Sequence, residues 1–336
     1  MKSIVLTGGG TAGHIMPNIA LLPSLKEYFS NIYYIGEKGK MEEKIAEKEG
    51  LPFYSAQSIK LVRGKILTNL RIPFVMAKGI KAAKLILSKL KPDVVFSKGG
   101  YCALPTVFAA RSLKIPVVCH ESDMTIGLAN RISMPFCAAF ITSFPKTSEK
   151  GICLGMPVRQ RIFEGNPQIV RNLFRIQRPI ILFLGGSLGA KAINDCLEKT
   201  LSALGDYNIL HIKGEKSLRH QENYFAIDFV DNIEDYFAAS DLIVCRAGAS
   251  TLAELTALGK KVLAIPLPEG ASRGDQVDNA AYYKKLGLIN VLPQEKLTPY
   301  NLMSFISDAV FSPSPQKVYD KKTPEKIVQE IVSHCR

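Results

Sequence analysis

Two apolar runs, each followed at once by a glycine-rich loop, constrain the fold of this chain most strongly. Residues 2–7 lead into Gly8-Gly9-Gly10-Thr11-Ala12-Gly13-His14, and residues 180–184 lead into Gly185-Gly186-Ser187-Leu188-Gly189-Ala190. A buried strand, a glycine turn and a helix form the opening unit of a parallel α/β sheet. Because this unit occurs twice in 336 residues, we expect two α/β domains of ordinary size.

Short apolar runs recur along both halves, as is typical of strands that are buried on both faces of a parallel sheet. The expected strands are 4–7, 32–35, 94–97, 117–120, 140–142, 180–184, 209–212, 242–245 and 262–265. Helical stretches lie between them, for example 79–90. This alternation predicts two Rossmann-like, doubly wound domains of the α/β class.

The connection between the two series begins at Gly155-Met156-Pro157-Val158-Arg159 and continues as a polar stretch to residue 178. We therefore expect a first domain over 1–157 and a second over 158–321. The last segment, about 322–336, places Ile327, Val328, Ile331 and Val332 on one helical face. Either domain offers a surface for this helix, and we expect it to pack back on the first domain.

The composition limits the class of protein. The chain is 47% hydrophobic and 22% charged, as in ordinary globular proteins, and contains no run of 18 apolar residues that predicts a membrane span. No secretory signal is visible, because the N-terminus reads as a first strand. The seven cysteines form no CxxC pair, which favours reduced thiols in a cytoplasm. We expect neither a metal site nor a bound cofactor.

The positive charge of the chain is concentrated in its first half. Residues 1–155 hold 21 Lys and Arg against 10 Asp and Glu, which points to an anionic partner, either a nucleic acid or an anionic membrane. Residues 50–92 contain nine basic residues, no acidic ones and many interleaved apolar side chains, with Lys78, Lys81 and Lys84 at helical spacing. This pattern favours a surface that lies on anionic lipid. A nucleic acid is not expected, since no binding motif is present, and a merely solvated helix face is the alternative.

Two segments of the first half contain candidate binding or catalytic residues. Gly8-x-Gly10-x-x-Gly13 matches the dinucleotide fingerprint formally, with Glu37 near the end of the second strand, and the alternative is a tight turn without a ligand. His14 lies where the following helix begins, and Pro17 is expected in its first turn. His120-Glu121-Ser122-Asp123 follows a strand, where an imidazole and carboxylates suit acid–base work. The alternative is that Asp123 caps the next helix.

The second half offers a similar choice. Thr251-x-x-Glu254 follows a strand and reads either as a capping box or as a helix start that faces a pyrophosphate, with Glu254 accepting from ribose hydroxyls. Ser187, in the second glycine loop, is placed to donate to a phosphate. The polar run 272–279 reads either as a ligand contact or as an exposed loop that enters a helix.

Together these motifs resemble the MurG family over nearly the whole chain and in the same order. The motifs are Gly8–His14, Lys98-Gly99-Gly100-Tyr101, His120-Glu121, Gly155-Met156-Pro157-Val158-Arg159, Gly185-Gly186-Ser187, Cys245-Arg246-Ala247-Gly248 and Gly274-Asp275-Gln276. The resemblance implies a GT-B fold, with two domains that face a cleft, and transfer of N-acetylglucosamine from UDP to lipid I, which gives lipid II of peptidoglycan synthesis. It places the acceptor in the first domain and the UDP-sugar mainly in the second.

The resemblance also implies which residues contact the donor. They are Thr11, Ala12, Gly13, Arg159, Ser187, Val230, Ala249, Ser250, Thr251, Leu252, Ala253, Glu254 and Gln276. Asp123 belongs to the same set, although many members of the family have asparagine there, and Ala12 stands where glycine is usual. Partners implied in this way are UDP-N-acetylglucosamine, lipid I, anionic inner-leaflet lipids and proteins of cell-wall synthesis, at the cytoplasmic side of the membrane.

The expected reaction is inverting, with direct attack of the acceptor hydroxyl on the anomeric carbon. Such a step needs a base, for which His14 is the first candidate and Glu121 the second. No Asp-x-Asp metal signature is present, so helix N-termini, Ser187 and Arg159 would stabilise the leaving diphosphate. The alternatives are a UDP-sugar epimerase of the same fold, an NAD-dependent oxidoreductase, and a nucleotide-binding regulator without catalysis.

Overall fold

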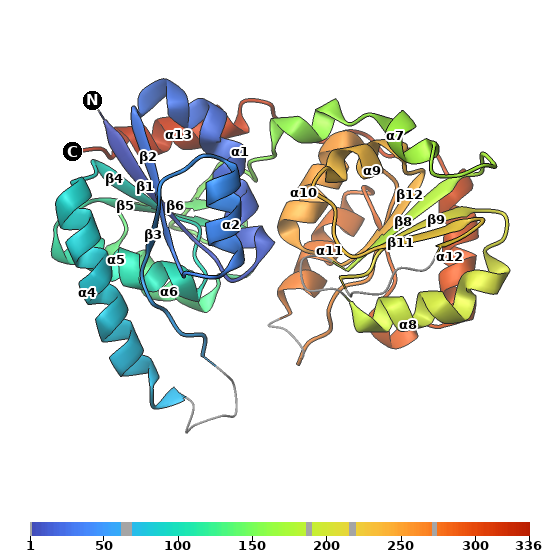
Figure 1. Cartoon of the computed structure of the whole chain (residues 1–336), viewed down its shortest axis with the longest axis horizontal. Coiled ribbons are helices and arrows are strands. Elements are labelled where there is room, and N and C mark those ends of the chain that lie inside the picture. Colours follow the sequence, from blue (N-terminus) through green and yellow to red (C-terminus); the bar gives the residue numbers. More distant parts are fainter. Residues whose placement is uncertain (1, 62–68, 186–189, 215–219, 271–273) are drawn as a thin grey trace. The chain divides into compact units, whose positions relative to one another are not determined.

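The computed structural model describes residues 2–61, 69–185, 190–214, 220–270 and 274–336 (Figure 1). The chain divides into two compact units, each with its own sheet. The first consists of Met1–Arg159 together with Lys321–Arg336, and the second of Gln160–Asp320. The division falls two residues after the expected domain boundary, and the C-terminal segment belongs to the first unit.

The first unit contains a seven-stranded sheet in which every pair of neighbours is parallel. Its order is β3-β2-β1-β4-β5-β6-β7. The strands are β1 (Ser3–Thr7), β2 (Asn31–Gly36), β3 (Phe53–Ser55), β4 (Val94–Ser97), β5 (Val117–Glu121), β6 (Ala139–Thr142) and β7 (Ile152–Cys153). The chain first winds outward from β1 to β3 and then in the opposite direction from β4. The carboxyl ends of β1 and β4 therefore meet at a topological switch point, where α/β sheets bind ligands.

Helices cover both faces of this sheet. They are α1 (Ala12–Tyr28), α2 (Met41–Lys48), α4 (Ile72–Leu90), α5 (Leu104–Ser112), α6 (Leu128–Ser133) and α13 (Thr323–Ser333). Ile4 and Leu6 pack with the helices α1, α2 and α13, whereas Val5 between them packs with α4 and α5 on the opposite face. This strict alternation explains why the strands are continuous apolar runs, since successive side chains enter different cores.

The helix α13 packs on α1 through its apolar stripe. Ile327, Val328 and Ile331 are fully buried in the same core as the residues of α1, so the last segment of the chain completes the first unit. We expected Pro17 in the first turn of α1, and this prediction is wrong. The helix begins at Ala12, five residues earlier, because the glycine loop ends there and Thr11 is the extended residue that precedes the helix.

The second unit also contains a seven-stranded sheet, in the order β10-β11-β9-β8-β12-β13-β14. The pair β10 and β11 is antiparallel and the other pairs are parallel. Its strands are β8 (Ile180–Leu184), β9 (Asn208–Ile212), β10 (His220–Gln221), β11 (Tyr224–Ile227), β12 (Leu242–Cys245), β13 (Val262–Ala264) and β14 (Asn290–Val291). Its switch point lies between β8 and β12, where the second glycine loop begins.

The helices of the second unit are α7 (Pro167–Arg171), α8 (Lys191–Thr200), α9 (Ile233–Ala239), α10 (Ala249–Leu258), α11 (Asp275–Lys285) and α12 (Pro299–Phe311). The capping-box interpretation of Thr251 and Glu254 is wrong. Gly248 is the N-cap of α10, so Thr251 is already the third residue of the helix and Glu254 lies in its second turn. Gly259 ends the helix in a left-handed conformation with φ of 68°, as the sequence suggested.

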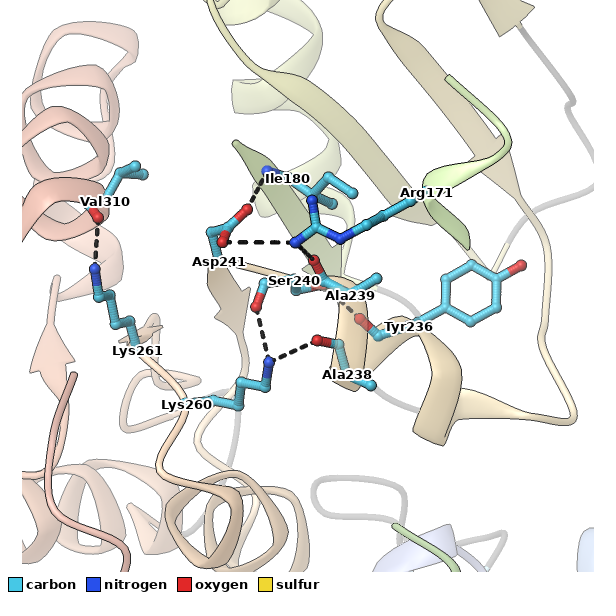
Figure 2. A network of polar contacts seen from close by, with 10 residues as sticks. All are labelled: Arg171, Ile180, Tyr236, Ala238, Ala239, Ser240, Asp241, Lys260, Lys261 and Val310. Carbon is cyan, nitrogen blue, oxygen red and sulfur yellow. Dashed lines mark hydrogen bonds and ion pairs between the residues drawn. The ribbon is translucent and has the colours of Figure 1, made fainter. Parts of the chain in front are cut away.

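The amino-terminal edge of the second sheet is held by cations that bind main-chain carbonyls (Figure 2). Lys260 Nζ donates to the carbonyl oxygens of Ala238 and Ser240 at 2.9 and 3.0 Å, at the carboxyl end of α9. Asp241 accepts from the N–H of Ile180 at 2.8 Å, which ties the starts of β8 and β12 together. A cavity of about 400 Å³ lies beside these residues. It is at the sheet edge opposite the glycine loop, so it is not part of the candidate site.

Candidate active site

The first part of the candidate site lies at the switch point between β1 and β4. The loops after these strands approach each other so closely that side chains would not fit at their glycines. A Cβ atom added to Gly10 would lie 2.7 Å from Cε1 of Tyr101, and Gly10 has a φ of +86°. A Cβ atom added to Gly100, whose φ is +77°, would collide with the carbonyl oxygen of Gly9. These glycines are required because only they allow the two loops to meet in these conformations.

His14 lies beside this contact as the third residue of α1, and its side chain is half-buried. Its Nδ1 is 3.0 Å from the hydroxyl oxygen of Thr11. The Thr11 hydroxyl therefore faces the imidazole instead of capping the helix backbone. When Nδ1 donates to this hydroxyl, Nε2 is the ring nitrogen with the basic lone pair. Ala12 and Gly13 form the start of the helix, where backbone N–H groups and the helix dipole favour an anionic ligand.

Glu121, the second candidate base, has a carboxylate that is fully engaged with its own loop. The residue is only 3% exposed. Its Oε1 accepts from the N–H groups of Ser122 and Asp123 at 2.9 and 3.1 Å. Its Oε2 accepts from the N–H of Gly127 at 2.8 Å and from Nδ2 of Asn130 at 3.0 Å. Four donors of this kind fix the shape of the loop after β5.

Asp123 lies within that loop and is half-buried. Its N–H donates to Glu121, and its carbonyl accepts from Oγ1 of Thr147 at 3.2 Å. The alternative that Asp123 caps the next helix is wrong, because α6 begins at Leu128 and its N-cap is Gly127. The loop that Glu121 holds separates Asp123 from the helix. A contact of Asp123 with the donor remains a prediction.

Sequence reasoning missed Lys98 as an individual residue, although it is part of the motif after β4. Its side chain is buried, and Nζ donates to the ring of His120 at Nδ1 and to Oγ of Ser122, the latter at 2.7 Å. Burial lowers the pKa of Lys98 to about 7, against the opposing charges of Glu121 and Asp123. Burial, together with the charge of Lys98, holds the pKa of His120 well below its usual range. The signal in the sequence was a lysine directly after a fully buried strand.

Arg159, a predicted donor contact, is the last residue of the first unit. It follows Met156, Pro157 and Val158, which are buried, and its own side chain is half-buried. Oγ of Ser143 donates to Sδ of Met156 at 3.8 Å and helps to hold this segment against the end of β6. Arg159 therefore directly follows a segment that burial and this hydrogen bond hold in place.

The second part of the candidate site is the start of α10, which follows β12 at the other switch point. The side chains of Ala249, Leu252 and Ala253 are buried, so these predicted contacts would involve main-chain atoms. Ser250 and Thr251 are half-buried, and Glu254 is 8% exposed. The polar groups here are thus the first N–H groups of the helix, two hydroxyls and one carboxylate. Ser187, predicted to donate to a phosphate, lies outside the described residues.

Val230 and Gln276 lie on the segments after β11 and at the start of α11. Val230 is half-buried. The carboxamide oxygen of Gln276 accepts from the N–H of Leu267 at 3.0 Å. This bond orients the side chain so that its nitrogen is the atom able to donate to a ligand. Gly274, with a φ of 84°, lets the chain turn into α11.

Arg246, from the motif after β12, has a structural role. Its Nη1 donates to the carbonyl of Ile265 at 3.0 Å and its Nη2 to Oε1 of Gln294 at 2.7 Å. Burial lowers the pKa of this guanidinium. These bonds connect the end of β12 with the end of β13 and with the segment that follows β14. Among the described residues, no group of three His, Cys, Asp or Glu side chains is placed to hold a metal ion.

Both halves of the chain match domain models of the same glycosyltransferase family. Residues 4–142 match the model of the glycosyltransferase family 28 N-terminal domain, and residues 180–334 match that of the family 28 C-terminal domain. A Clostridium botulinum protein (strain Kyoto) is 44% identical over 316 residues, which cover 90% of this chain and 89% of that protein. It is named UDP-N-acetylglucosamine–N-acetylmuramyl-(pentapeptide) pyrophosphoryl-undecaprenol N-acetylglucosamine transferase. A Clostridium perfringens relative of the same name is 43% identical over 318 residues, or 91% of this chain and 89% of that protein.

The crystal structure of Acinetobacter baumannii MurG superimposes with a TM-score of 0.73 at 25% identity, covering 99% of this chain and all of that one. This chain belongs to the MurG family. It is therefore a glycosyltransferase, and its two parallel-sheet units have the GT-B fold that we expected. The family assignment favours the transferase over the alternative functions.

Fold alone does not separate these alternatives. A putative UDP-N-acetylglucosamine 2-epimerase from Listeria monocytogenes superimposes with a TM-score of 0.69, although it is only 12% identical. The superposition covers 99% of this chain and 97% of the epimerase chain. Such a likeness shows the shared fold and nothing about the reaction. The assignment to the MurG family rests instead on sequence identity that extends over nine tenths of the chain.

Proposed function

We propose that this chain transfers N-acetylglucosamine from UDP-N-acetylglucosamine to the 4-hydroxyl of the muramoyl sugar of lipid I. The product is lipid II, so the protein acts in peptidoglycan synthesis and, through it, in cell-wall biogenesis, cell shape and cell division. The names of relatives at 43–44% identity over about nine tenths of the chain support this substrate pair. Proteins of cell-wall synthesis are the partners that such a role implies.

The observation that carries the mechanism is the geometry of His14. The acceptor hydroxyl attacks the anomeric carbon, the bond from that carbon to the UDP oxygen breaks, and UDP leaves with the electron pair. Nε2 of His14 takes the proton from the hydroxyl, while the Thr11 oxygen at 3.0 Å orients the ring through Nδ1. Because the attack is direct, the configuration at the anomeric carbon inverts.

The leaving diphosphate needs a positive field, and the residues after β12 support a role in providing it. The start of α10 has a helix dipole and backbone N–H groups, and Ser250 and Thr251 add hydroxyls. Arg159 and Ser187 are the other groups that we assign to the diphosphate. Glu254 accepts from the ribose hydroxyls, and Gln276 donates to the sugar through its carboxamide nitrogen.

We assign Glu121 a positioning role and leave the base to His14. Its carboxylate already accepts four hydrogen bonds within the loop after β5. Accepting a proton from substrate would compete with these bonds. The loop that it shapes carries Asp123, so loss of Glu121 should disturb the site without removing the base.

Membrane binding is the second element of the proposal, and the exposed side of α4 supports it. Phe74 is 75% exposed and Leu85 is 67% exposed, and they lie on the same helical face as Lys78 and Lys81. Exposed apolar side chains beside lysines suit a surface that lies on anionic lipid. No helix among the described residues is long and apolar enough to cross a membrane. We therefore propose peripheral binding to the inner leaflet through this face.

A thermal-shift comparison of three nucleotides tests the donor assignment. UDP-N-acetylglucosamine and UDP should each raise the melting temperature in a concentration-dependent manner, because both bind the folded state. NAD at the same concentrations should leave it unchanged. A shift with NAD and none with either uridine nucleotide would overturn the proposed donor site.

A further inference from the structure

A buried amine connects the segments that surround the first part of the site. Lys98 directly follows β4 and is 1% exposed. The main-chain N–H of Lys98 donates to the carbonyl oxygen of Thr7, at the end of β1, at 2.9 Å. A Cβ atom added to Gly8 would lie 2.9 Å from Cβ of Lys98, so the first glycine loop packs against the base of this side chain. Lys98 thus lies directly beneath the switch point.

The amine continues into a chain of hydrogen bonds. Nζ donates to Oγ of Ser122 at 2.7 Å and to Nδ1 of His120. Nε2 of His120 lies 3.1 Å from the carbonyl oxygen of Gly155. Because a carbonyl only accepts, Nε2 must carry the ring hydrogen, and Nδ1 is then the acceptor for Lys98. The amine therefore fixes the tautomer of His120 and, through it, holds Gly155 at the start of the segment that leads to Arg159.

Burial of the Lys98 amine lowers the stability of the folded protein. A buried ammonium loses its hydration, and such a group is normally paired with a carboxylate. Within the described part of the chain, no salt bridge joins Lys98 to an acidic side chain, and the nearby carboxylate of Glu121 is occupied by four other donors. An apolar side chain of similar length would fill the same space at lower cost. Groups that lower stability in this way are typical of functional sites.

We propose that Lys98 is a positioning residue for glycosyl transfer, which holds the ends of β4 and β5 and residue 155 in one arrangement through His120 and Ser122. This inference rests on the proposed function. Lys98 does not touch substrate, since its amine is buried and points at the other two side chains. Its contribution is the geometry of the loops that carry Tyr101 and Asp123 and of the segment that ends in Arg159.

The test compares the wild-type protein with Lys98→Met, which keeps the length of the side chain and removes the amine. Lys98→Met should lower kcat about 10- to 100-fold, the range expected when reacting groups are slightly misplaced. The KM for UDP-N-acetylglucosamine should rise by a smaller factor than kcat falls, because Asp123 and Arg159 shift with their segments whereas most of the assigned donor contacts lie in the second unit. The melting temperature should stay the same or rise. Lys44→Met is the matched control, since Lys44 is an exposed lysine of the same unit, and it should change none of these values.

A merely structural role predicts the opposite pattern, with a lower melting temperature and a normal kcat, and this result would overturn the proposal. Equal losses in kcat and in donor affinity would also overturn it. A double-mutant cycle with His120→Asn adds a second criterion. If Lys98 acts through His120, the double variant should lose no more activity than the more damaging single variant, whereas additive losses contradict the proposed connection.

A measurement on the unchanged protein keeps the inference testable if the variants do not fold. Nitrogen-15 NMR of labelled histidines in the wild-type protein near pH 7.5 should show His120 as the Nε2–H tautomer, with its ring signals assigned by their through-space contacts with Lys98 and with the adjacent Ser122. The Nδ1–H tautomer or a doubly protonated ring would contradict the hydrogen-bond chain. Wild-type protein without transfer activity would defeat the proposed function instead, and the tautomer would still decide the arrangement around Lys98.

Discussion

At the scale of single residues, the candidate site depends on which polar atoms the fold has already occupied. His14 and Glu121 both follow strands of the first sheet, and both are acid–base residue types. The contacts distinguish them, since Thr11 orients one nitrogen of His14 while the Glu121 carboxylate holds a loop. Sequence reasoning found both residues but had no means to rank them. Hydrogen bonds to backbone N–H groups depend on the loop conformation, which no residue pattern states.

The first prediction concerns His14. His14→Ala should lower turnover by roughly 10²–10⁴, the usual contribution of a positioned acid–base group, and should change UDP-N-acetylglucosamine affinity little. Turnover is measured with the donor and a soluble lipid I analogue, and donor affinity by calorimetry. His334→Ala is the matched control, because that histidine pairs with Glu330 at the end of α13. Near-normal turnover of His14→Ala would move the base role away from His14.

The second prediction concerns Glu254, which the fold places in the second turn of α10 and not in a capping box. If Glu254 accepts from ribose hydroxyls, Glu254→Gln should weaken UDP binding by roughly 1–3 kcal/mol, as for a lost charge-assisted hydrogen bond. Calorimetric titration and a thermal melt on the same sample decide the matter. Unchanged UDP affinity with a lower melting temperature would mean that the carboxylate serves the fold alone.

The third prediction concerns stability and pH. Burial lowers the pKa of Lys98 to about 7, whereas an unfolded lysine titrates near 10.5. Between these values the unfolded chain holds more protons than the folded one, so this group makes the protein more stable as pH rises. Urea unfolding at pH 7 and at pH 9.5 gives the change in the free energy of unfolding over this range. As pH rises, that free energy should increase more, or decrease less, for wild type than for Lys98→Met. Parallel pH dependence in the two proteins would show that Lys98 stays charged when folded.

At the scale of elements, the strands could be predicted well because each is a short apolar run that is buried on both sides. The runs 94–97, 180–184 and 242–245 coincide with β4, β8 and β12, and the other expected strands differ from the structure by at most one residue at either end. Sequence reasoning missed short strands such as β3, β7 and β14, which contain two or three residues and depend on a neighbour for pairing. Helix starts were harder to predict. Pro17 suggested a later start for α1, but the glycine loop ends at Thr11.

The fourth prediction belongs to α4, whose exposed face combines Phe74, Lys78, Lys81 and Leu85. Sedimentation with liposomes should show binding that needs anionic lipid and weakens as salt is raised. Replacing Lys78, Lys81 and Lys84 by glutamate should abolish most of this binding, at about 1 kcal/mol per engaged lysine. The same change at Lys284, Lys285 and Lys296, which are exposed lysines of the second unit, should not. Equal binding to neutral vesicles would contradict the proposed surface.

At the scale of the whole molecule, the duplication of strand, glycine loop and helix was sufficient to predict two doubly wound units. The structure adds that the last helix returns to the first unit, where Ile327, Val328 and Ile331 complete a core. Its apolar face was visible in the sequence, but two surfaces were available to it. Composition and periodicity predict which residues are buried, whereas the choice between two receiving surfaces depends on side-chain packing.

We propose that this molecule joins N-acetylglucosamine to lipid I by direct displacement. The most direct measurement incubates the purified protein with radiolabelled UDP-N-acetylglucosamine and a lipid I analogue, and then determines the anomeric configuration of the labelled product by NMR. We expect a disaccharide with a β-linked N-acetylglucosamine at the muramoyl 4-position, formed with stoichiometric release of UDP. An α-linked product would contradict the inverting mechanism. Conversion of the donor to its 2-epimer without any transfer would contradict the proposed function itself.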